Sequence, residues 1–194
     1  MLGLLTPTDP RWVEQAQQDL PALLSDHAHC ELKAAVSALS LVSRFGPLYP
    51  VLVAPLSELA HEETRHFREV HARLGDHAAP LGRQEADEYV NALWNATKLE
   101  RSRFPLLLDR LLVSSLIEAR SCERFKLLST GLSDSGLSAF YRELMESEAR
   151  HYRLFCGLSE ELFGVKMARD RLAELARREA KVAGTLPLGP KVHG

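Results

Sequence analysis

Two Glu-x-x-His pairs are the residues of this chain best suited to chemistry. The chain reads EETRHF at residues 62–67 and SEARHY at 147–152, which gives the pairs Glu63/His66 and Glu148/His151. Residues three apart share one face of a helix, so each pair would present a carboxylate and an imidazole side by side. That combination binds transition metals, but one such pair arises easily by chance. The pairs become meaningful only if the fold brings them into one site.

The elements that must position these pairs are predicted to be helices. Apolar residues recur at spacings of three and four in every long segment, and alternating strand patterns are absent. We expect long helices at about 25–44, 50–74 (or from Pro55), 105–129 and 137–158, and shorter ones at 9–20, 84–94 and 165–182. The pattern predicts two helical hairpins joined by a long crossover at 76–103.

Local signals set the expected helix ends. Ser25 or Asp26 is expected to cap the first long helix, and the sequence GPLYP at 46–50 ends it. Gly75 is expected to stop the second long helix, and the loop TGLSDSG at 130–136 separates the third from the fourth.

Composition indicates a single globular domain over residues 1–194. The chain is 45% apolar and 26% charged, which is typical of a folded domain with a full core. We expect a core bundle at about 25–160 and a C-terminal helix with a tail at 161–194. A net charge of −2 gives no global basic excess that would indicate a nucleic-acid or membrane partner. No apolar run reaches the roughly 18 residues of a membrane span, so we expect a cytoplasmic protein without membrane contact.

Cysteine usage argues against disulfides and zinc. The three cysteines are an odd number and show no CxxC spacing. We interpret Cys30, Cys122 and Cys156 as small buried residues.

Each long helix carries one glutamate on its apolar stripe. The stripes, with the glutamate and histidine positions included, are Leu24, Ala28, Glu31, Ala35, Ala38, Val42; Leu52, Leu56, Leu59, Glu63, His66, Val70, Leu74; Leu107, Leu111, Ser114, Glu118, Ser121, Phe125, Leu128; and Leu137, Tyr141, Leu144, Glu148, His151, Phe155, Leu158. All four glutamates should therefore face the interior. Glu123, Glu146 and Glu58 are not on these stripes, and we expect them on exposed or boundary faces.

Distance from the turn gives an independent test of this arrangement. In an antiparallel hairpin, residues equally far from the turn lie level with each other. Glu31 and Glu63 are centred on Pro47, inside the GPLYP turn. Glu118 and Glu148 are centred on Ser133, inside the TGLSDSG loop. Each hairpin should bring its two glutamates face to face.

Four converging buried carboxylates require compensating positive charge, because an unpaired buried charge is very costly. Two divalent metal ions would balance them, and two imidazoles would complete a set of oxygen and nitrogen ligands suited to iron or manganese. This set resembles the ligands of ferritin-like di-iron carboxylate proteins, in which two helices each give a Glu and two give Glu-x-x-His. The predicted fold class is therefore all-α, a ferritin-like four-helix bundle with a long crossover between helices two and three and short flanking helices.

Three longer stretches resemble one enzyme family. The runs HCELKAAVSALSLVSRF at 29–45, DRLLVSSLIEARSCERF at 109–125 and SEARHYRLF at 147–155 are similar to the bacterial tRNA hydroxylases that act on 2-methylthio-N6-isopentenyladenosine beside the anticodon. The similarity extends from about residue 26 to 163. It implies a non-haem di-iron monooxygenase that hydroxylates the isopentenyl side chain. The matching metal ligands are Glu31, Glu63, His66, Glu118, Glu148 and His151, with Glu63 and Glu148 as the bridging carboxylates.

The resemblance also implies cofactors and partners. The enzyme would need two iron ions, O2 as co-substrate and an external two-electron donor such as a reductase or ferredoxin, because the chain has neither a flavin motif nor iron–sulfur cysteines. No catalytic residue is expected beyond the metal centre. The RNA partner would be tRNA carrying a prenylated adenosine. Candidate phosphate contacts are Lys98, Arg101 and Arg103 in the crossover and Arg169, Arg171, Arg177 and Arg178 in the last helix. A solvated charged face would explain both clusters equally simply.

Other functions remain compatible with the same site. A ferritin-like fold could hydroxylate another small molecule such as a quinone, or bind and oxidise iron. A purely structural bundle would bind no metal.

Overall fold

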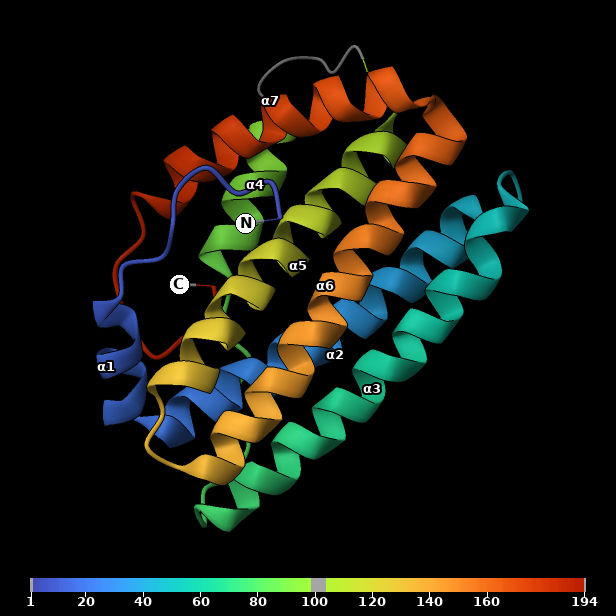
Figure 1. Ribbon diagram of the computed structural model, residues 1–194. Helices are drawn as coiled ribbons and strands as arrows, with labels where there is room; N and C mark the ends of the chain where they lie inside the picture. The colour runs from blue at the N-terminus through green and yellow to red at the C-terminus, as the bar shows by residue number, and fades with distance from the viewer. Residues whose placement is uncertain (1, 99–103, 194) are drawn as a thin grey trace. The chain divides into compact units, whose positions relative to one another are not determined.

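The computed structural model describes residues 2–98 and 104–193. The regular secondary structure of these residues is entirely helical, with no strand. Figure 1 shows the helices in chain order. They are α1 (Arg11–Gln18), α2 (Leu20–Phe45), the 3-10 helix η1 (Pro50–Leu52), α3 (Val53–Asp76), α4 (Glu88–Lys98), α5 (Leu106–Gly131), α6 (Ser135–Phe163) and α7 (Val165–Ala183).

The chain is organised in two compact units. The α2–α3 unit comprises residues 15–85 and 190–192. The α5–α6 unit comprises the residues before Gln15, residues 86–189 and the end of the tail. Each unit contains one of the two helical hairpins that the sequence predicts. The expectation of one domain over the whole chain stays a prediction.

The helix α2 begins earlier than expected. Asp19 caps it, because its side chain accepts a hydrogen bond from the backbone N–H of Ala22 at 3.0 Å. Pro21 is compatible with the first turn, where a missing N–H costs nothing. Ser25 and Asp26, the expected caps, therefore lie inside the helix. The prediction of Ser25 or Asp26 as the cap was therefore wrong, because Asp19, two residues before Pro21, caps the helix one to two turns earlier.

The hairpin of α2 and α3 turns at Gly46. A Cβ at this position would lie 2.5 Å from the carbonyl oxygen of Val42, so only glycine fits the turn. The next residues form η1, and α3 follows it directly. The two helices then run side by side (Figure 1). The predicted α3 stripe is buried throughout, whereas on α2 the buried residue near the end is Leu41 in place of Val42.

The second hairpin, α5 and α6, has equally clear boundaries. Pro105 precedes α5, and Asp134 caps α6 by accepting from the N–H of Leu137 at 2.9 Å. Gly164, with φ of +84°, ends α6 and lets α7 start in a new direction. Both predicted stripes of this hairpin are buried. The helix α6 continues beyond the expected Leu158 to Phe163.

A second layer within the α5–α6 unit consists of α4 and α7. Their apolar residues pack with one face of α5 in a buried cluster of Tyr89, Leu93, Leu108, Leu112, Val113, Leu116, Ala168, Leu175 and Ala176. The helix α4 starts after Asp87, which accepts from the N–H of Val90 at 2.9 Å. It therefore lies about four residues later than the expected 84–94. Because α5 is covered on several sides, nearly its whole surface is buried.

Candidate metal centre

The α2–α3 unit groups three of the predicted ligands. Glu31 comes from α2 and Glu63 and His66 from α3, and their ligand atoms lie within 4.8 Å of one another. All three side chains are buried, Glu63 completely. Nδ1 of His66 lies 3.2 Å from Oε2 of Glu63 and 3.8 Å from Oε2 of Glu31. The prediction that this hairpin brings its two glutamates level with each other is confirmed.

The α5–α6 unit contains a matching group. Glu118 comes from α5 and Glu148 and His151 from α6, again with ligand atoms within 4.8 Å of one another. All three are buried, and Nδ1 of His151 lies 3.9 Å from Oε2 of Glu118. In both units the histidine therefore turns Nδ1 toward the glutamate of the neighbouring helix. The midpoint argument holds for this hairpin as well.

A fourth polar residue extends the group in the α2–α3 unit. His27, one turn before Glu31 on α2, is fully buried, and its Nε2 lies 2.6 Å from Oε1 of Glu31. The sequence analysis did not predict a role for His27, because the predicted apolar stripe of this helix included Glu31 but not His27. The signal was present in the spacing of four residues, which places both side chains on one helix face.

The donor sets fit metal ions such as iron. Each unit offers two carboxylates and one imidazole from buried positions on two helices. Buried carboxylates need a nearby positive charge. Two of the buried arginines pair with other carboxylates: Arg120 with Glu123 and Glu179, and Arg171 with Asp109. Oxygen donors with imidazole nitrogen are the ligands expected for iron and manganese.

A buried ionic network in the α5–α6 unit was not predicted. Arg120 donates to Glu123 and, at 2.6 Å, to Glu179 of α7. Glu123 also accepts from the backbone and side chain of Thr8, and Glu179 accepts from the hydroxyl of Tyr89. The expectation of an exposed or boundary Glu123 was wrong, because α7 and the N-terminal segment cover this side of α5. Glu58 and Glu146 are exposed as expected.

The predicted RNA contacts of α7 differ in their exposure. Arg169 is exposed and pairs with Glu160 at 2.7 Å, and Arg177 is exposed. Arg178 is half-buried and donates to Glu174 and to the carbonyl of Ala96.

Arg171 does not fit the expectation of a phosphate contact. It is buried and donates to both carboxylate oxygens of Asp109, at 2.7 and 3.0 Å. Its guanidinium also lies over the ring of Phe104. The charge pattern of α7 could not reveal this, since the partner is on α5. Of the crossover residues, Lys98 ends α4, while Arg101 and Arg103 lie outside the described residues.

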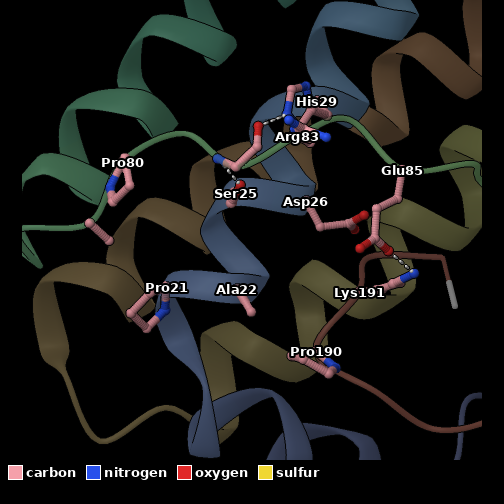
Figure 2. Close-up of a pocket in the computed structure, with 12 residues that line it drawn as sticks. Pro21, Ala22, Ser25, Asp26, His29, Pro80, Arg83, Glu85, Pro190 and Lys191 are labelled. Carbon is pink, nitrogen blue, oxygen red and sulfur yellow. Dashed lines mark hydrogen bonds and ion pairs between the residues drawn. The ribbon is translucent and has the colours of Figure 1, made fainter.

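A separate pocket of about 490 Å³ lies in the α2–α3 unit (Figure 2). It is formed by the start of α2, the segment after α3 and the tail at 190–191. Nε2 of His29 donates to the carbonyl of Gly82 at 2.9 Å, and Lys191 pairs with Glu85 at 2.7 Å. Among the described residues that line this pocket, none is a predicted metal ligand. The pocket is therefore distinct from the group around His66.

Burial also bears on the cysteines and on membrane contact. Desolvation raises the pKa of the Cys122 thiol to about 11 and also raises that of Cys156. Cys122 is buried as expected, whereas Cys30 and Cys156 are half-buried, so the expectation of buried residues was wrong for these two. None of the three cysteines, all of which lie in the described part of the chain, forms a disulfide. No helix in the described part of the chain is long and apolar enough to cross a membrane.

Two curated proteins are similar to this chain over most of its length. The tRNA 2-(methylsulfanyl)-N(6)-isopentenyladenosine(37) hydroxylase of Pseudomonas putida is 39% identical over 172 residues, which cover 88% of this chain and 81% of that protein. The hydroxylase of the same name from Salmonella typhimurium is 34% identical over 202 residues, covering 80% and 74%.

A solved structure, described as "Protein 43 with aldehyde deformylating oxygenase activity from Synechococcus", is 36% identical. It superposes with a TM-score of 0.90 and covers 98% of this chain and 95% of that one. The predicted all-α, ferritin-like fold is confirmed, and the chain is an enzyme of the monooxygenase type. The family described as tRNA-(MS[2]IO[6]A)-hydroxylase (MiaE) matches residues 2–194. Because that match spans nearly the whole sequence and both named relatives exceed 30% identity, this chain belongs to the tRNA-(MS[2]IO[6]A)-hydroxylase family.

Proposed function

We propose that this chain hydroxylates the isopentenyl side chain of 2-methylthio-N6-isopentenyladenosine in tRNA, next to the anticodon. The observation that carries the proposal is the family match over residues 2–194, in a chain whose two hairpins each hold a buried Glu, Glu and His group. The fold alone would not choose a substrate, since ferritin-like proteins serve several functions.

The metal centre of this enzyme would consist of two iron ions held by six residues, Glu31, Glu63, His66, Glu118, Glu148 and His151. Each hairpin supplies one glutamate from its first helix and a Glu-x-x-His pair from its second. Glu63 and Glu148 are the expected bridging ligands. When bound, two irons supply the O2 activation that is needed to hydroxylate an unactivated methyl group.

The two histidine ligands and the apolar residues near them have different roles. His66 and His151 turn Nδ1 toward the carboxylates, so Nδ1 is the nitrogen available to a metal ion. The neighbours of the ligand positions on the stripes, such as Leu59 and Val70 on α3 and Leu144 and Phe155 on α6, are buried and apolar. These side chains exclude water from the ligands, which strengthens metal binding and limits side reactions.

The reaction needs two electrons from another protein. Inserting one oxygen atom of O2 into a C–H bond releases the other as water, and this consumes two electrons and two protons. The three cysteines cannot form a four-cysteine iron–sulfur site, so we expect a reductase or ferredoxin as the electron donor.

The tRNA would approach basic residues on the surface. We retain Arg169, Arg177 and Arg178 of α7 as candidate phosphate contacts, together with the crossover residues Lys98, Arg101 and Arg103. Arg171 is left out because its guanidinium is buried against Asp109. A cytoplasmic location, where tRNA is modified, is part of this proposal.

Nucleoside mass spectrometry tests the function directly. Prenylated, methylthiolated tRNA is incubated with iron-loaded, reduced protein under ¹⁸O2. We expect one labelled oxygen atom in the isopentenyl adenosine, and its loss in Glu118→Ala. No label from protein that holds about two irons per chain, as its ligand set requires, would overturn the substrate and leave the metal centre intact.

A second candidate activity follows from the structural similarity. The Synechococcus protein is described as having aldehyde deformylating oxygenase activity and is 36% identical to this chain. If this chain acts on a free aldehyde, reduced protein under ¹⁸O2 would release the formyl carbon of an added aldehyde, and tRNA present in the same mixture would gain no ¹⁸O.

A further inference from the structure

His27 is a fully buried polar residue of the α2–α3 unit that the proposed ligand set does not use. It lies on α2, four residues before Glu31, and its side chain is 0% exposed. A buried imidazole needs a hydrogen-bonding partner, and Nε2 of His27 donates to Oε1 of Glu31 at 2.6 Å. This short contact ties a fully buried donor to a proposed metal ligand.

The contact distinguishes the two oxygens of Glu31. Oε1 is turned toward His27, whereas Oε2 lies 3.8 Å from Nδ1 of His66, which is the nitrogen proposed to bind metal. A carboxylate with one oxygen held by a donor has the other oxygen left for the metal ion. The geometry thus favours monodentate binding through Oε2.

His27 is placed as a partner of a ligand and not as a ligand. Among the described residues, the candidate ligand group around His66 includes Glu31 and Glu63 but not His27. Donors that hold a metal-binding side chain in place commonly raise metal affinity, and losing one typically costs 10–100-fold.

The other unit has a different residue at the matching position. Four residues before Glu118 on α5 stands Ser114, which is buried but has only a short hydroxyl side chain. A serine cannot place an imidazole N–H against the carboxylate. An imidazole four residues before the glutamate is therefore a feature of α2 and not of α5.

We propose that His27 is a positioning residue that holds Oε1 of Glu31, so that Glu31 binds metal through Oε2 alone, and that this contact raises the affinity of the metal position of the α2–α3 unit. The proposal rests on the metal centre of the proposed function. It goes further by assigning a role to a residue outside the ligand set.

The test uses the full chain loaded with Co(II), whose visible absorption weakens as its coordination number rises. His27→Phe keeps a ring of similar size without the donor, and His27→Gln restores a donor. His29→Gln is the matched control, because His29 is also buried on α2 but donates to the carbonyl of Gly82. Competition with a chelator gives the affinity of each bound ion, and thermal unfolding of the metal-free proteins checks the fold.

We expect wild type to bind two Co(II) ions. In His27→Phe one ion should bind about 10–100-fold more weakly, the other should change little, and the visible band should weaken as Glu31 becomes bidentate. His27→Gln should recover most of the affinity and the band, and His29→Gln should match wild type.

Three results would overturn the proposal. The first is unchanged affinity and spectrum in His27→Phe. The second is equal weakening of both ions without rescue by His27→Gln, which would indicate a general packing role. The third is a wild-type protein that binds fewer than two ions, which would also remove the proposed metal centre. Failure of the tRNA assay with normal Co(II) behaviour would instead count against the substrate alone.

Discussion

Oε2 of Glu63 lies 3.2 Å from Nδ1 of His66, one turn further along α3. The opposite nitrogen of this ring, Nε2, lies 3.3 Å from the guanidinium of Arg65 and 3.8 Å from Oε1 of Glu62. A metal ion on Nδ1 would require Nε2 to carry the proton. Arginine cannot accept that proton in a hydrogen bond, whereas the carboxylate of Glu62 can.

Glu62 is therefore expected to support His66 in the metal-bound protein. Glu62→Gln should weaken metal binding by about tenfold, because the acceptor for Nε2–H loses its charge. Arg65→Met should leave the affinity unchanged or raise it slightly. Chelator competition with both variants checks this, and equal affinities for Glu62→Gln and wild type would refute it.

Metal binding should stabilise the folded chain. Metal at about 100 times its dissociation constant would raise the free energy of unfolding by about 2.7 kcal/mol if it binds only the folded state. Glu118→Ala removes one buried carboxylate, so we expect a smaller stabilisation by Fe(II) or Mn(II). Thermal melts with and without metal measure the difference. A variant that gains as much stability from metal as wild type would exclude Glu118 from the ligands.

The ionic network around Arg120 should be critical for stability. Arg120→Met would leave Glu123 and Glu179 buried without their cation, and we expect a loss of about 3–5 kcal/mol in the free energy of unfolding. Arg169→Ala breaks an exposed pair and should cost no more than about 1 kcal/mol. Urea unfolding compares the two, and similar losses would mean that the buried network contributes little.

The Cys122 thiol should react slowly at neutral pH. Its pKa is raised to about 11 by burial, so only about one molecule in a thousand carries the thiolate at pH 8. We expect its alkylation rate in the folded protein to rise about tenfold per pH unit past pH 10. In denaturant the rate should level off near pH 9. Peptide mass spectrometry measures the alkylation of Cys122. An alkylation rate that levels off by pH 9 in the folded protein would contradict the raised pKa.

Phosphate contacts by α7 should be visible in the salt dependence of tRNA binding. Arg169→Ala and Arg177→Ala should each weaken binding and reduce the slope of log affinity against log salt by about one. Arg11→Ala, an exposed arginine on α1, is the control for a general loss of charge. Unchanged slopes in both α7 variants would place the RNA surface elsewhere.

Much of the proposed site could be predicted from sequence because its determinants are local. Helical periodicity put Glu31, Glu63, Glu118 and Glu148 on buried stripes, and the turn positions set their heights within each hairpin. Those relations depend only on helix geometry and chain connectivity. The same local rules failed where two start signals competed, as with Asp19 against Ser25.

The sequence by itself determined the helical class, the two hairpins and the glutamates and histidines that each hairpin buries. Only the tertiary structure decided which polar residues lie beside those ligands and which charges are buried. Arg120 meets Glu179 across 59 residues of chain, and Arg171 meets Asp109 across 62. Such partners follow from how α5 and α7 pack, and a helical pattern gives the direction of a side chain without saying what covers it.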